Sequence, residues 1–240
     1  DYMWHALNGD LGRSLQTNIP VATQIMLRLP WTIELAVMAM FLTMFLGIGL
    51  GLIAAIWHNT IVDTLAMIVA LIGISLPVYW SSILLIILFA VNLQVLPAIG
   101  QGGLERLIMP ATALALVSAG SLARMVRSSM LEVLNQDYVL TARSKGLSER
   151  IVVLRHALRN ALIPVVTIMG LTFGNLLGGA VITETIFARL GIGQMYVEAV
   201  LQKDFTLVQG TTLFIAVSYV LINILTDVIY VLIDPRIRYE

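Results

Sequence analysis

DYVLTARSKGLSERIVVLRHALRNALIP, residues 137–164, is a basic stretch in a chain of 240 residues that is 59% hydrophobic and only 12% charged. Half of the fourteen Lys and Arg residues lie between positions 124 and 159. They are Arg124, Arg127, Arg143, Lys145, Arg150, Arg155 and Arg159. Side chains of this charge do not face lipid tails, so we expect this segment to lie in water beside an otherwise apolar protein.

The rest of the chain has the composition of a membrane protein. A helix needs about 20 apolar residues to cross a bilayer core of about 30 Å. Five runs free of Asp, Glu, Lys and Arg approach or exceed this length: 35–57, 64–104, 107–123, 160–183 and 205–226. The second run is too long for one span, so we interpret it as a helix over 64–93 followed by a turn-rich segment, VLPAIGQGG, at the membrane surface. The sequence therefore predicts an all-α membrane protein, one transmembrane domain over 1–240 with five spans.

The distribution of basic residues predicts the orientation, because short loops rich in Lys and Arg stay in the cytoplasm. Residues 124–163 then form a cytoplasmic loop, while 1–30 and 184–209 are external. Nine basic residues become cytoplasmic, with Arg236 and Arg238 added to the seven above. Five become external: Arg13, Arg28, Arg106, Arg189 and Lys203. An external Asp1 also predicts that a further span precedes this sequence.

The quoted stretch has the signals of two short helices in series. Asp137 can cap a first helix that ends before Gly146, where a left-handed C-terminal residue is expected. Ser148 can cap a second helix with Ile151, Leu154 and Leu158 on one face, and Pro164 falls at the start of the next span. A simpler interpretation is a solvated loop whose charge only sets the topology. A loop that needs only charge has no use for two amphipathic helices, so we favour a docking element.

These residues resemble a known family. The run from Tyr138 to Gly146, followed by RHALRNALIP, is similar to the EAA-type cytoplasmic loop of ABC importer permeases of the dipeptide, oligopeptide, glutathione and nickel type. GDLGRS, RLPWTIELA, DFTLVQGTTLF and INILTDVIYVLIDPRIRY resemble other parts of the first permease of such systems. The general pattern begins with Glu and two Ala, whereas Leu140, Thr141 and Ala142 stand here. The spacing from Gly146 to Pro164 is also longer than in the general pattern, and both departures are usual in the peptide-type branch.

The resemblance implies a type I importer permease bundle in a bacterial inner membrane, working as half of a heterodimer by alternating access. Its partners would be a second permease, two P-loop ATPase subunits or domains, an external solute-binding protein and membrane lipid. ATP and Mg would be bound by the ATPases, because this chain lacks GxxxxGK[ST]. The coupling helix that docks on the ATPase would be formed by Asp137, Tyr138, Val139, Thr141, Ala142, Arg143, Lys145 and Gly146. Tyr138, Val139 and Ala142 would supply apolar fit, and Arg143 and Lys145 polar contacts.

Small residues in the spans indicate close helix contacts. Glycines recur every four residues at Gly170, Gly174 and Gly178, and Gly47 and Gly51 repeat this spacing. A substrate-lining role is the alternative for the first group. Pro77 is expected to bend its helix, and the residues predicted to border a translocation path are Ser75, Pro77, Tyr79, Trp80 and Asn175. Kinks without any transport role, and an amide that binds a neighbouring helix, remain alternatives.

Other functions find little support in the sequence. There is no Cys, no GxSxG and no HExxH, and the three His residues fall in predicted loops or ends, so we expect no catalytic residue, no metal site and no enzyme. Nucleic-acid binding is disfavoured because the basic residues adjoin spans. A free-standing channel or ion-coupled carrier is the alternative function. It would need no ATPase, and a carrier would need intramembrane charge, which is scarce here.

Overall fold

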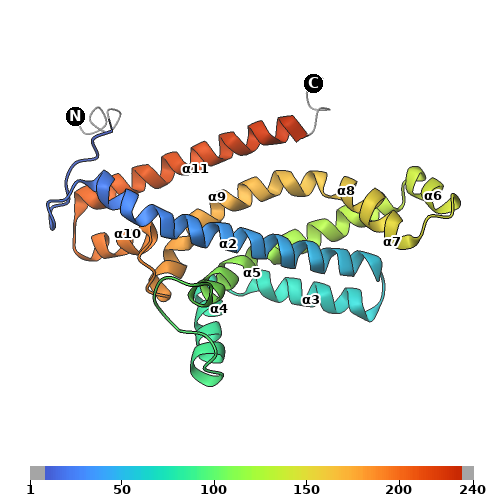
Figure 1. The fold of residues 1–240 in the computed structure, drawn as a ribbon, viewed down its shortest axis with the longest axis horizontal. Helices are drawn as coiled ribbons and strands as arrows, with labels where there is room; N and C mark the ends of the chain where they lie inside the picture. Colours follow the sequence, from blue (N-terminus) through green and yellow to red (C-terminus); the bar gives the residue numbers. More distant parts are fainter. Residues whose placement is uncertain (1–8, 234–240) are drawn as a thin grey trace. The chain divides into compact units, whose positions relative to one another are not determined.

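The computed structural model describes residues 9–233, except for the side chains at 166–168, 171, 175, 177–179, 227 and 229–233. In this part the protein is helical, and the only strand-like pairing is one isolated bridge between Arg13 and Pro20. The elements in chain order are α2 (Val21–Ile56), α3 (Ile61–Ser75), α4 (Val78–Leu85), η1 (Ile86–Asn92), α5 (Leu104–Leu134), α6 (Asp137–Ser144), α7 (Glu149–Ile151), η2 (Val152–Ala157), α8 (Leu158–Ala161), α9 (Ile163–Ile186), α10 (Ile192–Leu201) and α11 (Phe205–Ile233) (Figure 1). The two η elements are π-helical. The prediction of an all-α protein is confirmed.

Among the described residues, α2, α5 and the 205–226 part of α11 are long and apolar enough to cross a membrane. The broken pair formed by α3 and α4–η1 qualifies as a fourth span if it is counted as one. The 24-residue helix α9 covers the remaining predicted span, with part of its side chains outside the described set. The chain is thus a multi-pass membrane protein.

The expected continuous helix over 64–93 is wrong, because the helix stops at Ser75 and starts again at Val78. Leu76 and Pro77 between them have extended backbone, with ψ angles of 119° and 143°. Proline disfavours helical geometry in the residue before it and cannot donate the hydrogen bond that would continue the ladder. Pro77 therefore breaks the helix where a bend was expected.

Two helices extend beyond their apolar runs. α2 begins at Val21, inside the segment 1–30 that was expected to precede the first span, and α5 continues to Leu134, inside the expected loop 124–163. The 36 residues of α2 are about 54 Å long at 1.5 Å per residue, well above the thickness of a bilayer core. Both helices therefore extend beyond the apolar segments from which they were predicted.

The chain divides into two compact units, and α2, α5, α9 and α11 each contribute to both. Of the described residues, unit 1 comprises 9–40, 77–114 and 173–222. Unit 2 comprises 41–76, 115–172 and 223–233. The basic stretch and its helices belong to unit 2.

In unit 2, α5 approaches α2 and α3 at backbone distance. A Cβ at Gly51 of α2 would lie 2.5 Å from the carbonyl oxygen of Ala123. A Cβ at Gly120 of α5 would lie 2.2 Å from the carbonyl oxygen of Ala70 on α3. Only glycine permits such contacts, because a methyl group would overlap a backbone that cannot move locally.

The other predicted glycines lie in different surroundings. A Cβ at Gly47 would be 2.8 Å from Leu122, and one at Gly170 would meet the side chain of Thr226 on α11. Gly174 in unit 1 is buried, and the side-chain position of Gly178 lies outside the described residues. Gly73 and Gly120 were not singled out from the sequence, although both make close backbone contacts in unit 2.

An ion pair that sequence reasoning missed joins α3 to α5 in unit 2. The Arg127 guanidinium contacts both carboxylate oxygens of Asp63 at 2.7 Å. The Asn59 amide and the His58 ring also lie within hydrogen-bond distance of this carboxylate, which is 5% exposed. Two parallel hydrogen bonds fix both the distance and the angle between the groups. The pair therefore holds the start of α3 against the second half of α5.

In unit 1, two buried carboxylates hold loops in place. Glu184 of α9 accepts hydrogen bonds from the Thr32 hydroxyl at 2.6 Å and from the Gly193 amide at 2.8 Å. Asp204, before α11, accepts from the Ser14 hydroxyl and from the Leu207 amide. Burial raises the pKa of Asp204, but these hydrogen bonds outweigh it and leave the pKa below its usual value. The carboxylates thus satisfy the free amides at the starts of α10 and α11.

The Gly51 contact predicts that Gly51→Ala destabilises unit 2 by about 1–3 kcal/mol, because the added methyl group has no space beside α5. Gly49→Ala is the matched control, since nothing lies within 4 Å of a Cβ at Gly49. The measurement is the temperature at which the purified protein loses its size-exclusion peak. Equal losses for the two variants would contradict the packing described here.

Candidate functional site

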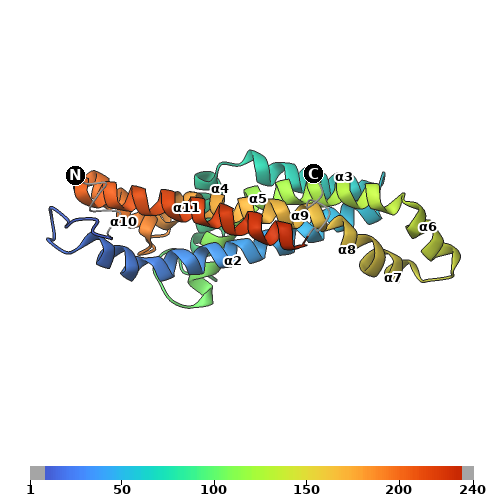
Figure 2. The same cartoon turned by 90° about the horizontal axis from the view of Figure 1, so that it is seen from above.

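The helix α6 is a two-turn segment between α5 and α7. Figures 1 and 2 both show α6 and α7 beyond the C-terminal end of α5. Gln136, with extended backbone, occupies the N-cap, and Asp137 is the first helical residue rather than the expected cap. Asp137 still places negative charge in the first turn, where the helix dipole favours it.

Gly146 ends this helix in the left-handed region with a φ of +78°. This conformation costs about 1–2 kcal/mol for a residue with a Cβ. A Cβ at Gly146 would meet nothing within 4 Å, so the requirement is one of backbone conformation and not of space. The position thus matches the C-terminal glycine expected from the sequence.

One face of α6 is buried inside the chain itself. Val139 is 0% exposed and Ala142 is 7% exposed, and both pack against Val152 of η2. They were expected to contact a partner protein, but their side chains are already covered within the chain. Val139 and Ala142 therefore hold α6 in position.

Arg143 is also used within the loop. Its guanidinium contacts the Glu149 carboxylate at 2.6 and 3.1 Å and so links the last turn of α6 to the first residue of α7. The hydrogen bond with Arg143 lowers the pKa of Glu149 and raises that of Arg143. Both side chains are partly exposed, so the pair contributes less than about 1 kcal/mol. The expected contact between Arg143 and a partner's carboxylate is thus replaced by an internal one.

The uncovered surface of α6 and of the turn that follows it consists of other side chains. Leu140 is 62% exposed, which is unusual for a leucine on a helix that packs by its opposite face. Tyr138 and Leu147 are each 38% exposed, and Thr141 and Lys145 are exposed as well. Leu140 and Leu147 were not predicted as site residues. The helical spacing could have identified Leu140, because this residue lies on the side of the helix opposite Val139 and Ala142.

The second helix of the loop has a different register from the expected one. Ile151 and Leu154 were expected on its apolar face with Leu158, but both are exposed. Val152 and Ala157 are fully buried instead, five residues apart. The π-helical turn η2 causes this shift, because its hydrogen bonds join residues five apart and move the buried face around the helix.

The residues predicted for a translocation path fall in both units. Ser75 belongs to unit 2, whereas Pro77, Tyr79 and Trp80 belong to unit 1, and all four are exposed. The side chain of Asn175 lies outside the described residues. Their roles remain predictions.

Unit 1 contains a mainly apolar cavity of about 830 Å³. Residues of α2, α9, α10 and α11 line it. They include Thr32, Gly174, Tyr196, Ser218 and Tyr219. Gly174, which the sequence suggested for close helix packing or for a substrate-lining role, is thus one of the residues around this cavity.

The φ of Gly146 predicts a graded effect of substitution. Gly146→Val is expected to weaken the α6–α7 turn by about 1–2 kcal/mol, whereas Gly146→Asn costs less because Asn tolerates this conformation. Hydrogen exchange of the α6 amides measures the difference, with faster exchange for Val than for Asn. Equal protection in both variants would contradict the conformational role of Gly146.

Comparison with protein families places most of the chain in one family. Residues 47–239 match the model described as "Binding-protein-dependent transport system inner membrane component". The match includes α6 and its turn at Gly146 as well as most of the helices of both units.

Curated proteins that are named as permeases align with nearly the full length of this chain. The chain is 46% identical to a Brucella abortus (strain 2308) protein that carries the name of a peptide transport system permease, over 100% of this chain and 79% of that protein. It is 42% identical to the glutathione transport system permease protein GsiC of Escherichia coli O6:H1, over 100% and 78%. It is 40% identical to the dipeptide transport system permease protein DppB of Alkalihalophilus pseudofirmus, over 99% and 80%.

Solved structures support the same fold. A chain of the MetNI methionine ABC transporter in an inward-facing conformation superposes with a TM-score of 0.73 at 18% identity, over 88% of this chain and 96% of that one. A chain of an amino acid ABC transporter superposes with a TM-score of 0.64 at 14% identity, over 98% of both chains. By sequence and by fold, the chain belongs to the binding-protein-dependent transport system inner membrane components and is a permease of an ABC importer.

Proposed function

We propose that this chain is one of two permeases in an importer of the bacterial inner membrane and that α6 is the element by which a separate ATPase subunit drives it. The observation that carries the proposal is the division of α6 into two faces. Val139 and Ala142 fix the helix to its own chain, while Leu140 and Tyr138 stay uncovered. A helix of two turns is marginal in water alone, so its packing makes it a preformed contact.

The surroundings of α6 suit the transmission of force. The internal cluster of Val139, Ala142 and Val152 also includes Val133 and Leu134, which end α5. α5 in turn is packed against α2 and α3 through glycines and is tied to α3 by the Asp63–Arg127 pair. A displacement of α6 is therefore expected to move the second half of α5 together with the helices that it contacts.

Energy for transport is assigned to partner subunits. The sequence contains no Gly followed by Lys and hence no P-loop, so we assign ATP and Mg to the ATPases. We place the basic segment 124–163 in the cytoplasm, where those subunits lie, and 184–209 outside, where a solute-binding protein delivers its cargo. An ABC permease needs these partners, which disfavours the free-standing channel or carrier considered above.

We assign small peptides as the transported class. Relatives that align over nearly the whole chain are named as permeases for peptides, dipeptides and glutathione, which is itself a tripeptide. Uptake of labelled dipeptide and of labelled glutathione, measured in cells with and without this chain, shows which of these two solutes depends on it. Loss of neither uptake on deletion would overturn the assignment of the class.

If the uncovered face of α6 contacts the ATPase, Leu140→Asp is expected to leave the protein in the membrane but to reduce its co-purification with the ATPase at least tenfold. A charge in a contact that excludes water costs about 2 kcal/mol or more. The matched control is Leu15→Asp in unit 1, since Leu15 is 65% exposed and lies far from α6 in the sequence. The measurement is the ratio of ATPase to permease after affinity purification in mild detergent. Unchanged co-purification of Leu140→Asp, or equal loss with Leu15→Asp, would contradict the docking role.

A further inference from the structure

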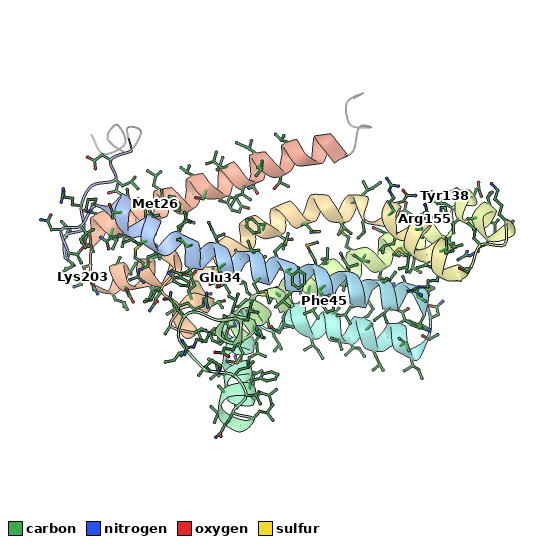
Figure 3. All side chains as sticks on the ribbon, in the orientation of Figure 1. Met26, Glu34, Phe45, Tyr138, Arg155 and Lys203 are labelled. Carbon is green, nitrogen blue, oxygen red and sulfur yellow. The ribbon has the colours of Figure 1, made fainter. Side chains whose placement is uncertain are left out.

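A pocket of about 610 Å³ lies in unit 2, beside but not on the uncovered leucine of α6. Its polar lining comes from Tyr138 of α6, Arg155 and His156 of η2, and Arg159 and Asn160 of α8. Figure 3 shows Tyr138 and Arg155 at the same end of this unit, on neighbouring elements. The pocket thus gathers two guanidinium groups, an imidazole, a phenol and an amide around one space.

The two guanidinium groups are not neutralised by the chain. Among the side chains that the structure describes, Arg155 and Arg159 have no acidic partner, whereas Arg127, Arg143 and Arg189 each have one. Arg155 and Arg159 lie four residues apart and therefore on the same side of their helical segment. Two like charges at this spacing repel each other, so an anion between them would stabilise the site.

The other polar groups are arranged as donors. The Asn160 amide donates a hydrogen bond of 2.7 Å to the Tyr138 hydroxyl oxygen. Since that oxygen already accepts, its own proton is free to be donated to a ligand in the pocket. Guanidinium groups present several N–H donors in a planar fork that matches the oxygens of a phosphate group. The chemistry of the pocket therefore suits a phosphate more than a single carboxylate.

The remaining walls of the pocket are apolar and lead into a span. Leu162 and Ile163 complete the lining, and Ile163 is the first residue of α9, which covers the span predicted over 160–183. The cationic groups thus lie where the apolar surface of the span begins. A phospholipid has the same order of groups, with a phosphate at the head and acyl chains beside it.

We propose that this pocket binds the phosphate headgroup of an anionic phospholipid and so anchors the loop beside α6 to the membrane. Basic pockets at the ends of spanning helices are recognised sites for such headgroups. The proposal goes beyond the transport function and does not depend on which solute is carried. Anchoring would limit the motion of η2, against which α6 packs through Val139 and Ala142.

The test is native mass spectrometry of the purified transporter complex, titrated with phosphatidylglycerol or with phosphatidylcholine. The wild-type complex is expected to bind phosphatidylglycerol more tightly. The double variant Arg155→Gln with Arg159→Gln is expected to bind it at least tenfold more weakly, since each cation near a membrane contributes about 1 kcal/mol. Arg155→Lys with Arg159→Lys keeps the charges and should retain most of the preference. The matched control is Arg150→Gln, an exposed basic residue of the same loop that does not line the pocket.

Each of the following results would overturn the proposal. The first is equal binding of the two lipids by the wild type, and the second is unchanged phosphatidylglycerol binding by the Gln double variant. If in this second case the Gln double variant also loses the ATPase, the pocket binds an acidic protein segment instead. Inorganic phosphate is added in a separate arm. Displacement of phosphatidylglycerol by millimolar phosphate would assign the site to a soluble phosphate and would equally reject a lipid.

Discussion

The close approach of α5 to α2 and α3 is the constraint on which unit 2 depends. At Gly51 and Gly120 the backbones come so near that a single methyl group would overlap a carbonyl oxygen. Inside a membrane the hydrophobic effect does not drive helices together, because lipid tails are as apolar as the helices. Close packing of this kind is therefore a principal source of attraction between spans. The result is a group of three helices that cannot slide past each other without separating.

The coupling element is built on the end of this packed group. α5 continues to Leu134, and after two intervening residues α6 begins at Asp137 and packs against η2 through Val139 and Ala142. Gly146 closes the turn in a conformation that few other residues adopt, and Arg143 joins both sides of it through Glu149. Each of these contacts is modest, but together they leave α6 with one orientation and with Leu140 uncovered. The ion pair between Asp63 and Arg127 then links the same stretch of α5 to α3.

Much of this could be predicted from the sequence, because apolar runs, glycine spacing and the position of Gly146 each have a local physical meaning. The break at Pro77 was placed correctly but underestimated, since the extended residue before a proline stops a helix where a bend was expected. The two faces of α6 were confused because Val139, Leu140 and Ala142 are all apolar, and only the contact with Val152 shows which face is covered. The π-turn η2 has no clear sequence signal, so the register after Ser148 could not be found. The Asp63–Arg127 pair joins residues 64 positions apart and needs the tertiary fold.

The proposed function requires that α6 contacts the ATPase by the face that carries Leu140. The chain has no cysteine, so one introduced cysteine reports on one position. Leu140→Cys and Val139→Cys are compared in native membranes with a short thiol-to-amine cross-linker. This contact predicts a cross-linked product of permease and ATPase for position 140, which is 62% exposed, and none for position 139, which is fully buried. No product at position 140 in a variant that still transports would contradict it.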